Sequence, residues 1–188
     1  RLVVNNTREP EDRNLDLKVQ VATNDFGVIQ TTKLIEKMGL EAMEVAVEDL
    51  LIYTSRRLKK HLLALKQGSS SFTTWMDDDG LEGQTLPLKA NVKIEDGYLL
   101  IDFSGSGPQS RGAFNVMTTG VVATVSYAVK ALLDPDLPAN DGLYSVIQLN
   151  MPRGSILNPV YPAAVGARTT TCQKLAGAIF GAFAQLLK

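Results

Sequence analysis

The chain has 188 residues, of which 45% are hydrophobic and 21% are charged, and its formal net charge at pH 7 is −1. This composition is typical of a soluble globular protein with one or two domains, and the balanced charge gives no electrostatic reason to expect nucleic acid or an anionic membrane as partner. The single cysteine, Cys172, excludes an internal disulfide and suits a reducing cytoplasm, and no apolar run approaches the ~20 residues that a membrane span needs.

The first third of the chain has the periodicity of two helices. Pro10 suits the first turn of a helix, where its missing N–H costs nothing, Gly27 makes a bend possible, and Gly39 suits the end. Apolar residues recur at alternating intervals of four and three, which places them on one helical stripe: Leu15, Val19, Ala22, Phe26 and Ile29. A similar stripe predicts a second helix from about Glu41 to Lys66: Met43, Val47, Leu50, Thr54, Leu58, His61 and Leu65. We therefore expect a helical hairpin over residues 1–67, whose stripes could pack on each other, on a sheet or on a partner subunit.

The periodicity then changes from helical to that of strands. Gly68-Ser69-Ser70 is expected to end the second helix, and Phe72–Met76 predicts a short strand. Leu88–Ile94 alternates apolar and polar residues, and Tyr98–Phe103 is its expected return strand. Asp96-Gly97 between them favours a tight hairpin, because both residues tolerate a positive φ. These patterns predict an antiparallel pair of strands.

Two more helices and one more strand are predicted in the rest of the chain. Thr118–Leu133 is small and apolar nearly all round, which indicates a buried helix. Tyr144–Met151 reads as a strand, and a final helix is expected to start near Thr170 or Thr171. The predicted fold class is therefore α+β, with the N-terminal helical hairpin followed, over residues 68–188, by a small mainly antiparallel sheet and two further helices.

Few side chains in this sequence could hold a metal or act as a nucleophile. The densest carboxylate cluster, Asp77–Asp79, lacks the spacing of a calcium loop, so an acidic turn is favoured over a metal site. His61 is favoured as a partly buried, hydrogen-bonded histidine over a catalytic base. Cys172 is favoured as a packing residue, because no neighbouring histidine supports a catalytic pair. The basic cluster Arg56–Lys60 is favoured as a solvated helix face over a phosphate site.

Two polar segments remain candidates for function. The loop Ser104–Gly107 directly follows a predicted strand, and it offers backbone N–H groups and two hydroxyls to an anion or an amide. It is neither a Walker motif nor a dinucleotide fingerprint, and the alternative is a turn that redirects the chain. In the segment Arg168–Thr171, the arginine could pair with a carboxylate or phosphate, and the threonines could contact a ligand or, as is favoured, cap the last helix.

At these segments the chain resembles the hydantoinase B family. Its members include the B-type component of ATP-dependent N-methylhydantoinases, the C-terminal half of 5-oxoprolinases, and the large subunits of acetone and acetophenone carboxylases. The resembling stretches follow in the family's order: Arg8–Gln20, Trp75–Gly80, Leu100–Gln109, Phe114-Asn115, Leu133–Gly142, Pro152–Pro159 and Pro162–Val165. They cover essentially this whole chain but only a middle section of the longer family subunit. Together with a first residue that is Arg rather than Met, this implies an internal fragment.

This chain departs from the family pattern at two places. The family's upstream part, with His- and Asp-based metal ligands, has no counterpart here, so no metal-binding residue carries over. After Val165 many members have a Gly-Gly-Asn sequence, whereas this chain has Gly166-Ala-Arg-Thr-Thr-Thr, a version similar to that of carboxylase-like and related members. Because of this difference, the sequence does not identify the substrate of the complete enzyme.

The resemblance implies a reaction that begins with ATP. A hydantoinase A-type partner phosphorylates the oxygen of a lactam, amide or ketone, and the B-type subunit completes hydrolysis, or carboxylation in the ketone carboxylases. It implies ATP and a divalent metal for the complete enzyme, no cofactor in this fragment, and an oligomer with the A-type subunit in the cytoplasm. Three interpretations stay open: a fragment of a cyclic amide hydrolase, which leads, a fragment of a ketone carboxylase, or a structural and interaction module that is inactive alone.

We expect a substrate-binding or interface site, with no residue assigned a catalytic role, at Asp102, Ser104, Gly105, Ser106, Asn115, Arg168 and Thr169. The loop donors suit a developing oxyanion or a substrate carboxylate, Asn115 can orient an amide, and Arg168 can bind a carboxylate or phosphoryl group bidentately. The alternative is that Asp102 and Asn115 only hydrogen-bond the loop, while Arg168 makes a structural ion pair.

Overall fold

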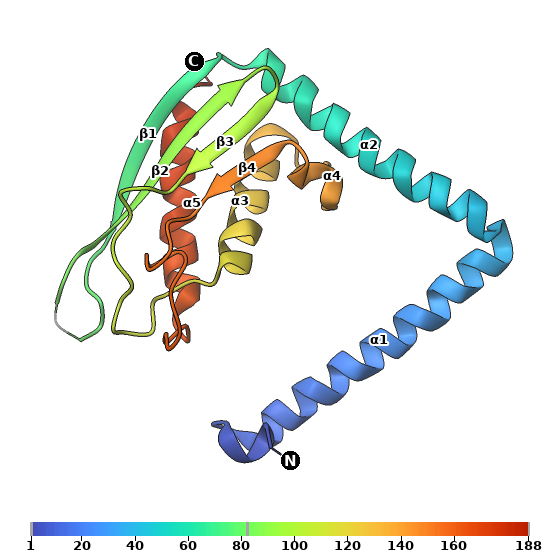
Figure 1. The fold of residues 1–188 in the computed structure, drawn as a ribbon, viewed down its shortest axis with the longest axis horizontal. Coiled ribbons are helices and arrows are strands. Elements are labelled where there is room, and N and C mark those ends of the chain that lie inside the picture. The colour runs from blue at the N-terminus through green and yellow to red at the C-terminus, as the bar shows by residue number, and fades with distance from the viewer. Residues whose placement is uncertain (1, 82, 188) are drawn as a thin grey trace. The chain divides into compact units, whose positions relative to one another are not determined.

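The computed structural model describes residues 2–81 and 83–187, and the chain forms two compact units, residues 1–49 and 50–188. The first unit holds a 3-10 turn, η1 (Val4–Asn6), the helix α1 (Pro10–Met38) and the beginning of α2 (Leu40–Ala64) (Figure 1). The second unit holds the rest of α2, a four-stranded sheet and the helices α3, α4 and α5. Among the described helices, none combines the length and the apolar character needed to cross a membrane.

The bounds of α1 confirm the predicted start and end of the first helix. Pro10 occupies the first helical position, and Gly39 ends the helix with a φ of 85° while its N–H donates to the carbonyl of Ile35 at 2.8 Å. Gly27 does not interrupt the helix. α2 follows directly, so both predicted helices are present; the packing expected of a helical hairpin stays a prediction.

The sheet of the second unit has the strand order β1-β2-β3-β4. The strands are β1 (Gly68–Met76), β2 (Leu86–Glu95), β3 (Tyr98–Asp102) and β4 (Ile147–Asn150). β1 and β3 both pair antiparallel with β2, whereas β4 pairs parallel with β3. The β2–β3 hairpin confirms the predicted one, because Asp96 and Gly97 have φ values of 51° and 78°. The sheet is therefore mainly antiparallel, as expected.

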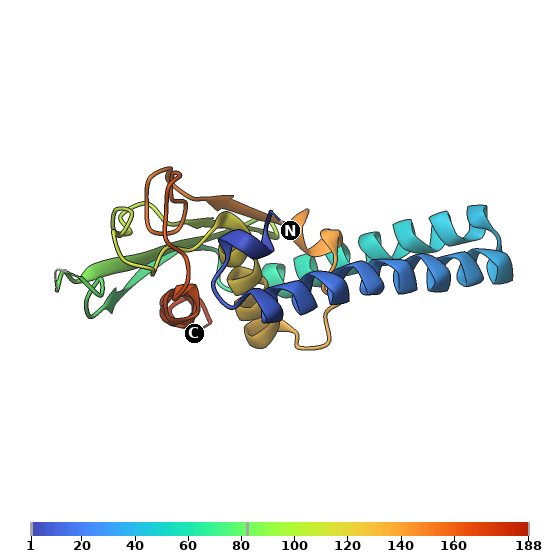
Figure 2. The same cartoon turned by 90° about the horizontal axis from the view of Figure 1, so that it is seen from below.

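One face of this sheet is covered by two helices. Alternate residues of β2 are buried against α5 (Arg168–Ala184), which also packs on β1 and on α3 (Thr118–Leu133) (Figures 1 and 2). The largest fully buried side chains come from α2, the sheet, the short helix at residues 141–144, α5 and the loops: Leu58, Leu62, Leu88, Ile94, Leu99, Ile101, Phe103, Leu137, Leu143, Ile156, Leu157 and Phe183. The opposite face of the sheet carries the polar members of the same alternation, which places Asp102 there.

The starts of β1, β4 and α5 differ from the sequence prediction. β1 begins at Gly68 instead of Phe72, because its serines pair with β2 and Ser70 Oγ donates to the carbonyl of Ala182 at 2.6 Å. β4 begins at Ile147, because Asn140 caps the short helix α4 (Asp141–Tyr144) in the preceding segment. α5 begins at Arg168, earlier than expected, and the following threonines lie inside its first turn. The helix has no side-chain cap, so the favoured capping role of these threonines is wrong.

The second half of α2 is anchored by the segment Leu133–Gly142. Arg57 forms two hydrogen bonds with the buried Asp134, one of them between Nη2 and Oδ1 at 2.7 Å, and the His61 Nε2 lies 3.2 Å from Asp134 Oδ2. The hydrogen bonds from Arg57 hold the pKa of Asp134 below its usual value, although burial opposes this shift. α4 also approaches α2 closely, since a Cβ on Gly142 would lie 2.2 Å from the carbonyl oxygen of Leu51. This motif of the family resemblance therefore has a structural role.

Candidate functional site

Asp102 lies at the end of β3 in a polar row that crosses the exposed face of the sheet. Asn91 of β2 and Asn150 of β4 are its neighbours in register. Asp102 Oδ1 accepts hydrogen bonds from the Ser104 N–H at 2.9 Å and from Asn150 Nδ2 at 2.8 Å. Burial alone would raise the pKa of Asp102, but hydrogen bonds from Ser104 and Asn150 and the nearby charge of Lys89 lower it below its usual value. Asp102 is therefore an ionised group that shapes the loop.

The Ser104–Gly107 loop is held over β2 by its own polar groups. Ser106 Oγ accepts from the Lys89 N–H at 3.0 Å and lies 3.2 Å from the Lys89 carbonyl oxygen, to which its hydroxyl donates. Asn91 Nδ2 donates to the carbonyl oxygens of Asp102 and Ser104 at 2.9 and 3.1 Å. Gly105 takes a φ of 93°, which other residues rarely adopt, and directs the chain back across the strand. Most of the loop's polar side-chain atoms are thus occupied in fixing its conformation.

Lys89 is the residue of this region that the sequence interpretation missed. A Cβ on Gly105 would lie 3.0 Å from Lys89 Cδ and 4.0 Å from Lys89 Nζ, so the ammonium group lies beside the loop. The signal was present in the alternating strand, because Lys89 occupies an outward position two residues from Asn91. The loop therefore has a cation beside its backbone, and this combination suits a carboxylate or a phosphoryl oxygen.

Asn115 is fully buried, and its amide binds the backbone on both sides. Its Oδ1 accepts from the Ser110 N–H at 2.8 Å. Its Nδ2 donates to three carbonyl oxygens, those of Ser110 at 2.9 Å, Gly112 at 3.2 Å and Ala164 at 3.0 Å. Both N–H groups of Nδ2 are therefore used, and one of them is shared between two carbonyl oxygens. Asn115 therefore positions the segment 110–112 relative to Ala164, whereas the structural alternative had it hydrogen-bond the Ser104–Gly107 loop.

Arg168 and Thr169 lie elsewhere, at the start of α5. They line a groove of about 370 Å³ between α3 and α5, together with Gly120, Ala123, Thr124, Tyr127, Cys172, Gln173 and Ala176. The walls of the groove are largely apolar, and Arg168 is the one charged residue among those that line it. Cys172 is half-buried in the same wall. An apolar ligand with an anionic group would match this arrangement.

The expected site residues thus form two clusters. Asp102, Ser104, Gly105 and Ser106 share one hydrogen-bonded loop, whereas Arg168 and Thr169 share the groove. In the described part of the chain, no hydrogen bond joins one cluster directly to the other. Asn115 belongs to the segment between them, since Thr171 Oγ1 donates at 2.6 Å to the carbonyl of the preceding residue, Phe114.

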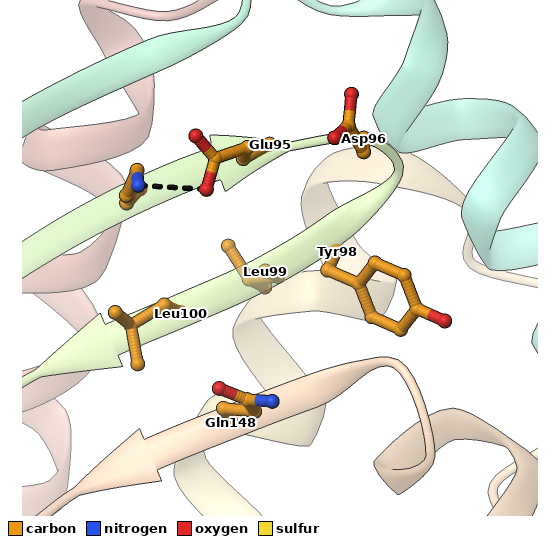
Figure 3. A pocket seen from close by; sticks show the side chains of 7 residues that line it. Glu95, Asp96, Tyr98, Leu99, Leu100 and Gln148 are labelled. Atoms are coloured by element: carbon orange, nitrogen blue, oxygen red, sulfur yellow. Dashed lines mark hydrogen bonds and ion pairs between the residues drawn. The ribbon is translucent and has the colours of Figure 1, made fainter.

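A further depression of about 300 Å³ lies on the exposed sheet face next to the β2–β3 turn (Figure 3). It is lined by Lys93, Glu95, Asp96, Tyr98, Leu99, Leu100 and Gln148. Lys93 Nζ pairs with Glu95 Oε2 at 2.7 Å, and the Tyr98 hydroxyl accepts a hydrogen bond from Lys59 Nζ at 2.7 Å. No sequence pattern indicated this depression. Two of its three charged groups, Lys93 and Glu95, are paired with each other, and the surface as a whole is amphipathic.

No group of three or more His, Cys, Asp or Glu side chains that could hold a metal ion occurs among residues 2–81 and 83–187. The acidic turn after β1 instead uses its carboxylates locally. Asp78 Oδ1 accepts from the Gly80 N–H at 2.6 Å, and Asp79 Oδ1 accepts from the Leu81 N–H at 3.0 Å. These residues therefore do not fit the divalent metal that the family resemblance implies for a complete enzyme.

Comparisons with a family profile and with individual proteins relate this chain to the same group of proteins. The sequence profile of the family described as Hydantoinase B/oxoprolinase matches residues 1–188. The chain is 30% identical over 180 residues to the 5-oxoprolinase PfmaA of Pestalotiopsis fici, which covers 94% of this chain and 14% of that protein. It is 26% identical over 197 residues to the B-type component of a putative D-/L-hydantoinase of a Pseudomonas species. This alignment covers 99% of this chain and 33% of that protein.

Two solved structures share the fold. The ATP-dependent caprolactamase from Pseudomonas jessenii superposes with a TM-score of 0.84 at 22% identity, over 96% of this chain and 31% of that one. The nucleotide-free structure of an acetone carboxylase superposes with a TM-score of 0.64 at 17% identity, over 84% of this chain and 24% of that one. The chain thus spans about a third or less of the length of the proteins it matches.

Proposed function

Because this chain belongs to the Hydantoinase B/oxoprolinase family, we propose that it is part of the B-type subunit of an ATP-dependent enzyme that hydrolyses a cyclic amide. The observation that carries the proposal is the family match over residues 1–188, supported by relatives named as 5-oxoprolinase and as the B-type component of a hydantoinase. Two of the stretches of family resemblance lie together in the fold, since Leu100–Gln109 and Pro152–Pro159 are joined by backbone hydrogen bonds.

In this proposal the complete enzyme is cytoplasmic and oligomeric, and it includes an A-type partner that binds ATP and phosphorylates the substrate oxygen. The name of the hydantoinase relative, which designates one subunit of an enzyme, supports a partner subunit. The described residues lack a cluster of metal ligands, so we derive no step of the reaction through a metal in this part of the subunit. ATP and the divalent metal would be bound by other parts of the assembly.

The Ser104–Gly107 loop and Lys89 would contact the substrate or the subunit interface. Lys89 adds a positive charge next to a loop whose backbone is exposed at Gly105, and this supports a role with a carboxylate or a phosphoryl oxygen. Asp102 holds the loop through the Ser104 N–H. Asn115 contributes by positioning the loops, and Arg168 and Thr169 would bind a second part of a substrate or partner in the groove between α3 and α5.

A ketone carboxylase is the second candidate for the complete enzyme. The segment after Val165 favours it, because the Arg-Thr sequence at residues 168–169 resembles that of carboxylase-like members. In the structure these two residues line the groove, where they could select between substrates. The third candidate, a structural and interaction module without activity of its own, is compatible with either enzyme when the 188 residues are considered alone.

Turnover by the complete enzyme tests the three candidates. The full-length subunit, combined with its A-type partner, is assayed on 5-oxoproline, hydantoins, lactams and acetone, each with and without ATP. Ring opening that depends on ATP supports the hydrolase, and ATP-dependent carboxylation of acetone would instead establish the carboxylase. The 188-residue chain alone is expected to show neither ATP hydrolysis nor ring opening, and ATPase activity that survives extensive purification would contradict its assignment as an incomplete part.

A further inference from the structure

The helix α1 carries many large apolar side chains, and the described residues of the first unit leave most of them exposed. All its large apolar side chains except that of Ile35 are exposed, including Phe26 at 62% and Val28 at 66%. The stripe expected from the sequence lies on one side of the helix: Leu15, Val19, Ala22, Phe26 and Ile29. A second stripe lies on another side: Leu17, Val21, Val28 and Ile35. At 3.6 residues per turn, the centres of the two stripes are about 140° apart around the helix axis.

The charge distribution of α1 separates a solvent side from the rest. The central fourteen residues, Val19–Thr32, contain a single charged residue, Asp25. Asp25 lies on a narrow side between the two stripes, in line with Lys18 and Glu36 nearer the helix ends, whereas Lys33, just beyond the central part, continues the Phe26 stripe. On the opposite side, Gln20, Thr23, Gly27 and Thr31 are uncharged. Depletion of charge over three sides is typical of the centre of a protein interface and not of a solvated helix.

The composition of α1 also requires packing partners. Seven of the fourteen residues from Val19 to Thr32 are β-branched, and Gly27 lies in the middle of the helix. Both features lower the intrinsic stability of a helix, and the start of α1 has no side-chain cap. Most helical stability in proteins comes from tertiary packing of apolar faces, and here the exposed stripes are the faces available for it.

We propose that α1 is an interior helix of the complete subunit, held between two apolar surfaces that both come from parts of the same polypeptide outside residues 1–188. Two observations favour this occupant. The caprolactamase chain that shares the fold over 96% of this chain is about three times as long, because the match covers 31% of it. A second copy related by a two-fold axis would present one self-complementary patch, which accounts for one stripe and leaves the other exposed. The proposal rests on family membership and is independent of the reaction.

Hydroxyl-radical footprinting of the full-length subunit tests it, because the method labels exposed side chains directly. The subunit is measured without its A-type partner, at a series of concentrations that includes the monomer, and each rate is compared with that of the urea-unfolded subunit. The monomer is expected to show Phe26 and Val28 labelled about tenfold more slowly than in the unfolded subunit. Rates close to those of the unfolded subunit at either residue would overturn the proposal. Protection that appears only on self-association, or only after the A-type subunit is added, would also overturn it.

Lysine substitutions give a second measurement with a matched control. Phe26→Lys and Val28→Lys place a charge on each stripe, whereas Asp25→Lys places the same side chain on the charged side of the same helical turn. The two stripe variants should melt several degrees below wild type or accumulate as insoluble subunit, and Asp25→Lys should behave like wild type. Equal melting temperatures for all three variants would refute burial of the stripes.

Discussion

Replacing Asn115 with alanine should destabilise the unit that contains the sheet, instead of acting through a lost substrate contact. The side chain is fully buried and makes four hydrogen bonds to backbone groups. After truncation, the Ser110 N–H loses its acceptor, and the carbonyls of Ser110 and Gly112 lose a donor in a buried environment. The carbonyl of Ala164 belongs to an exposed residue, so water can replace the lost donor there.

The size of the effect follows from these unpaired groups. A buried donor or acceptor left without a partner costs about 1–3 kcal/mol, and this penalty applies in full to the Ser110 N–H. A water molecule in the space left by the amide can bond to some of the carbonyls, which reduces the remaining penalty. The expected loss for Asn115→Ala is therefore about 2–4 kcal/mol in the free energy of unfolding.

Urea unfolding followed by tryptophan fluorescence measures this loss. Trp75 is the single tryptophan of the chain and lies in β1, in the same unit as Asn115. The midpoint should move to lower urea while the slope of the transition stays unchanged. Asn158→Ala is the control, because its side chain makes one bond, from Nδ2 to the Met151 carbonyl at 2.8 Å, and should cost only about 1 kcal/mol. A wild-type midpoint for Asn115→Ala, combined with loss of turnover in the complete enzyme, would refute the structural role.

Four further substitutions test other parts of the structure. Hydrogen bonds from Arg57 lower the pKa of Asp134 in the folded protein. Asp134 therefore stabilises the fold at pH values above its unfolded pKa of about 4, and this stability is lost as the pH falls through the folded pKa. Asp134→Asn should therefore lower stability at neutral pH and flatten its acid dependence in pH-dependent melting, and an unchanged profile would contradict this. Gly142→Ala places a Cβ 2.2 Å from a carbonyl oxygen of α2 and should cost about 1–3 kcal/mol in urea unfolding, whereas no loss would show that α4 moves freely. Ser104→Ala and Arg168→Ala in the complete enzyme should each lower kcat/KM at least about tenfold, or about 1.4 kcal/mol, with an unchanged Tm; wild-type kinetics would remove the residue from the site.

The elements that could be predicted from the sequence are those with local signals. The β2–β3 hairpin follows from alternation on both sides of Asp96-Gly97, and α3 has the predicted bounds because its residues are apolar on almost every side. α1 begins at a proline and ends at a glycine. In each case the residues that determine the structure are adjacent in the sequence. The preference of this local segment for a helix or a hairpin agrees with its tertiary contacts.

The remaining features depend on residues that are distant in the sequence. Arg57 and Asp134 are 77 positions apart, and the pattern around each one indicates only a helix and a helix end. β4 pairs parallel with β3, and a strand's own alternation does not indicate which strand it will join. For Lys89 the strand alternation indicates only an outward position, and its place beside Gly105 results from the loop turning back over β2.

The two clusters of the candidate site are related through the segment that contains Asn115. Its side chain binds the backbone at residues 110–112 and at Ala164, while Thr171 ties the first turn of α5 to the residue before it. A change at Asn115 will therefore shift the Arg168 groove as well as the loops, and its effect on turnover cannot be assigned to one cluster. The Ser104–Gly107 loop joins this segment through Ile156, whose N–H donates to the Gly107 carbonyl and whose carbonyl accepts from the Val116 N–H. Single variants at Ser104 and Arg168 and the double variant therefore separate the clusters. Additive losses would indicate two independent contacts, and a smaller loss in the double variant would indicate one shared ligand.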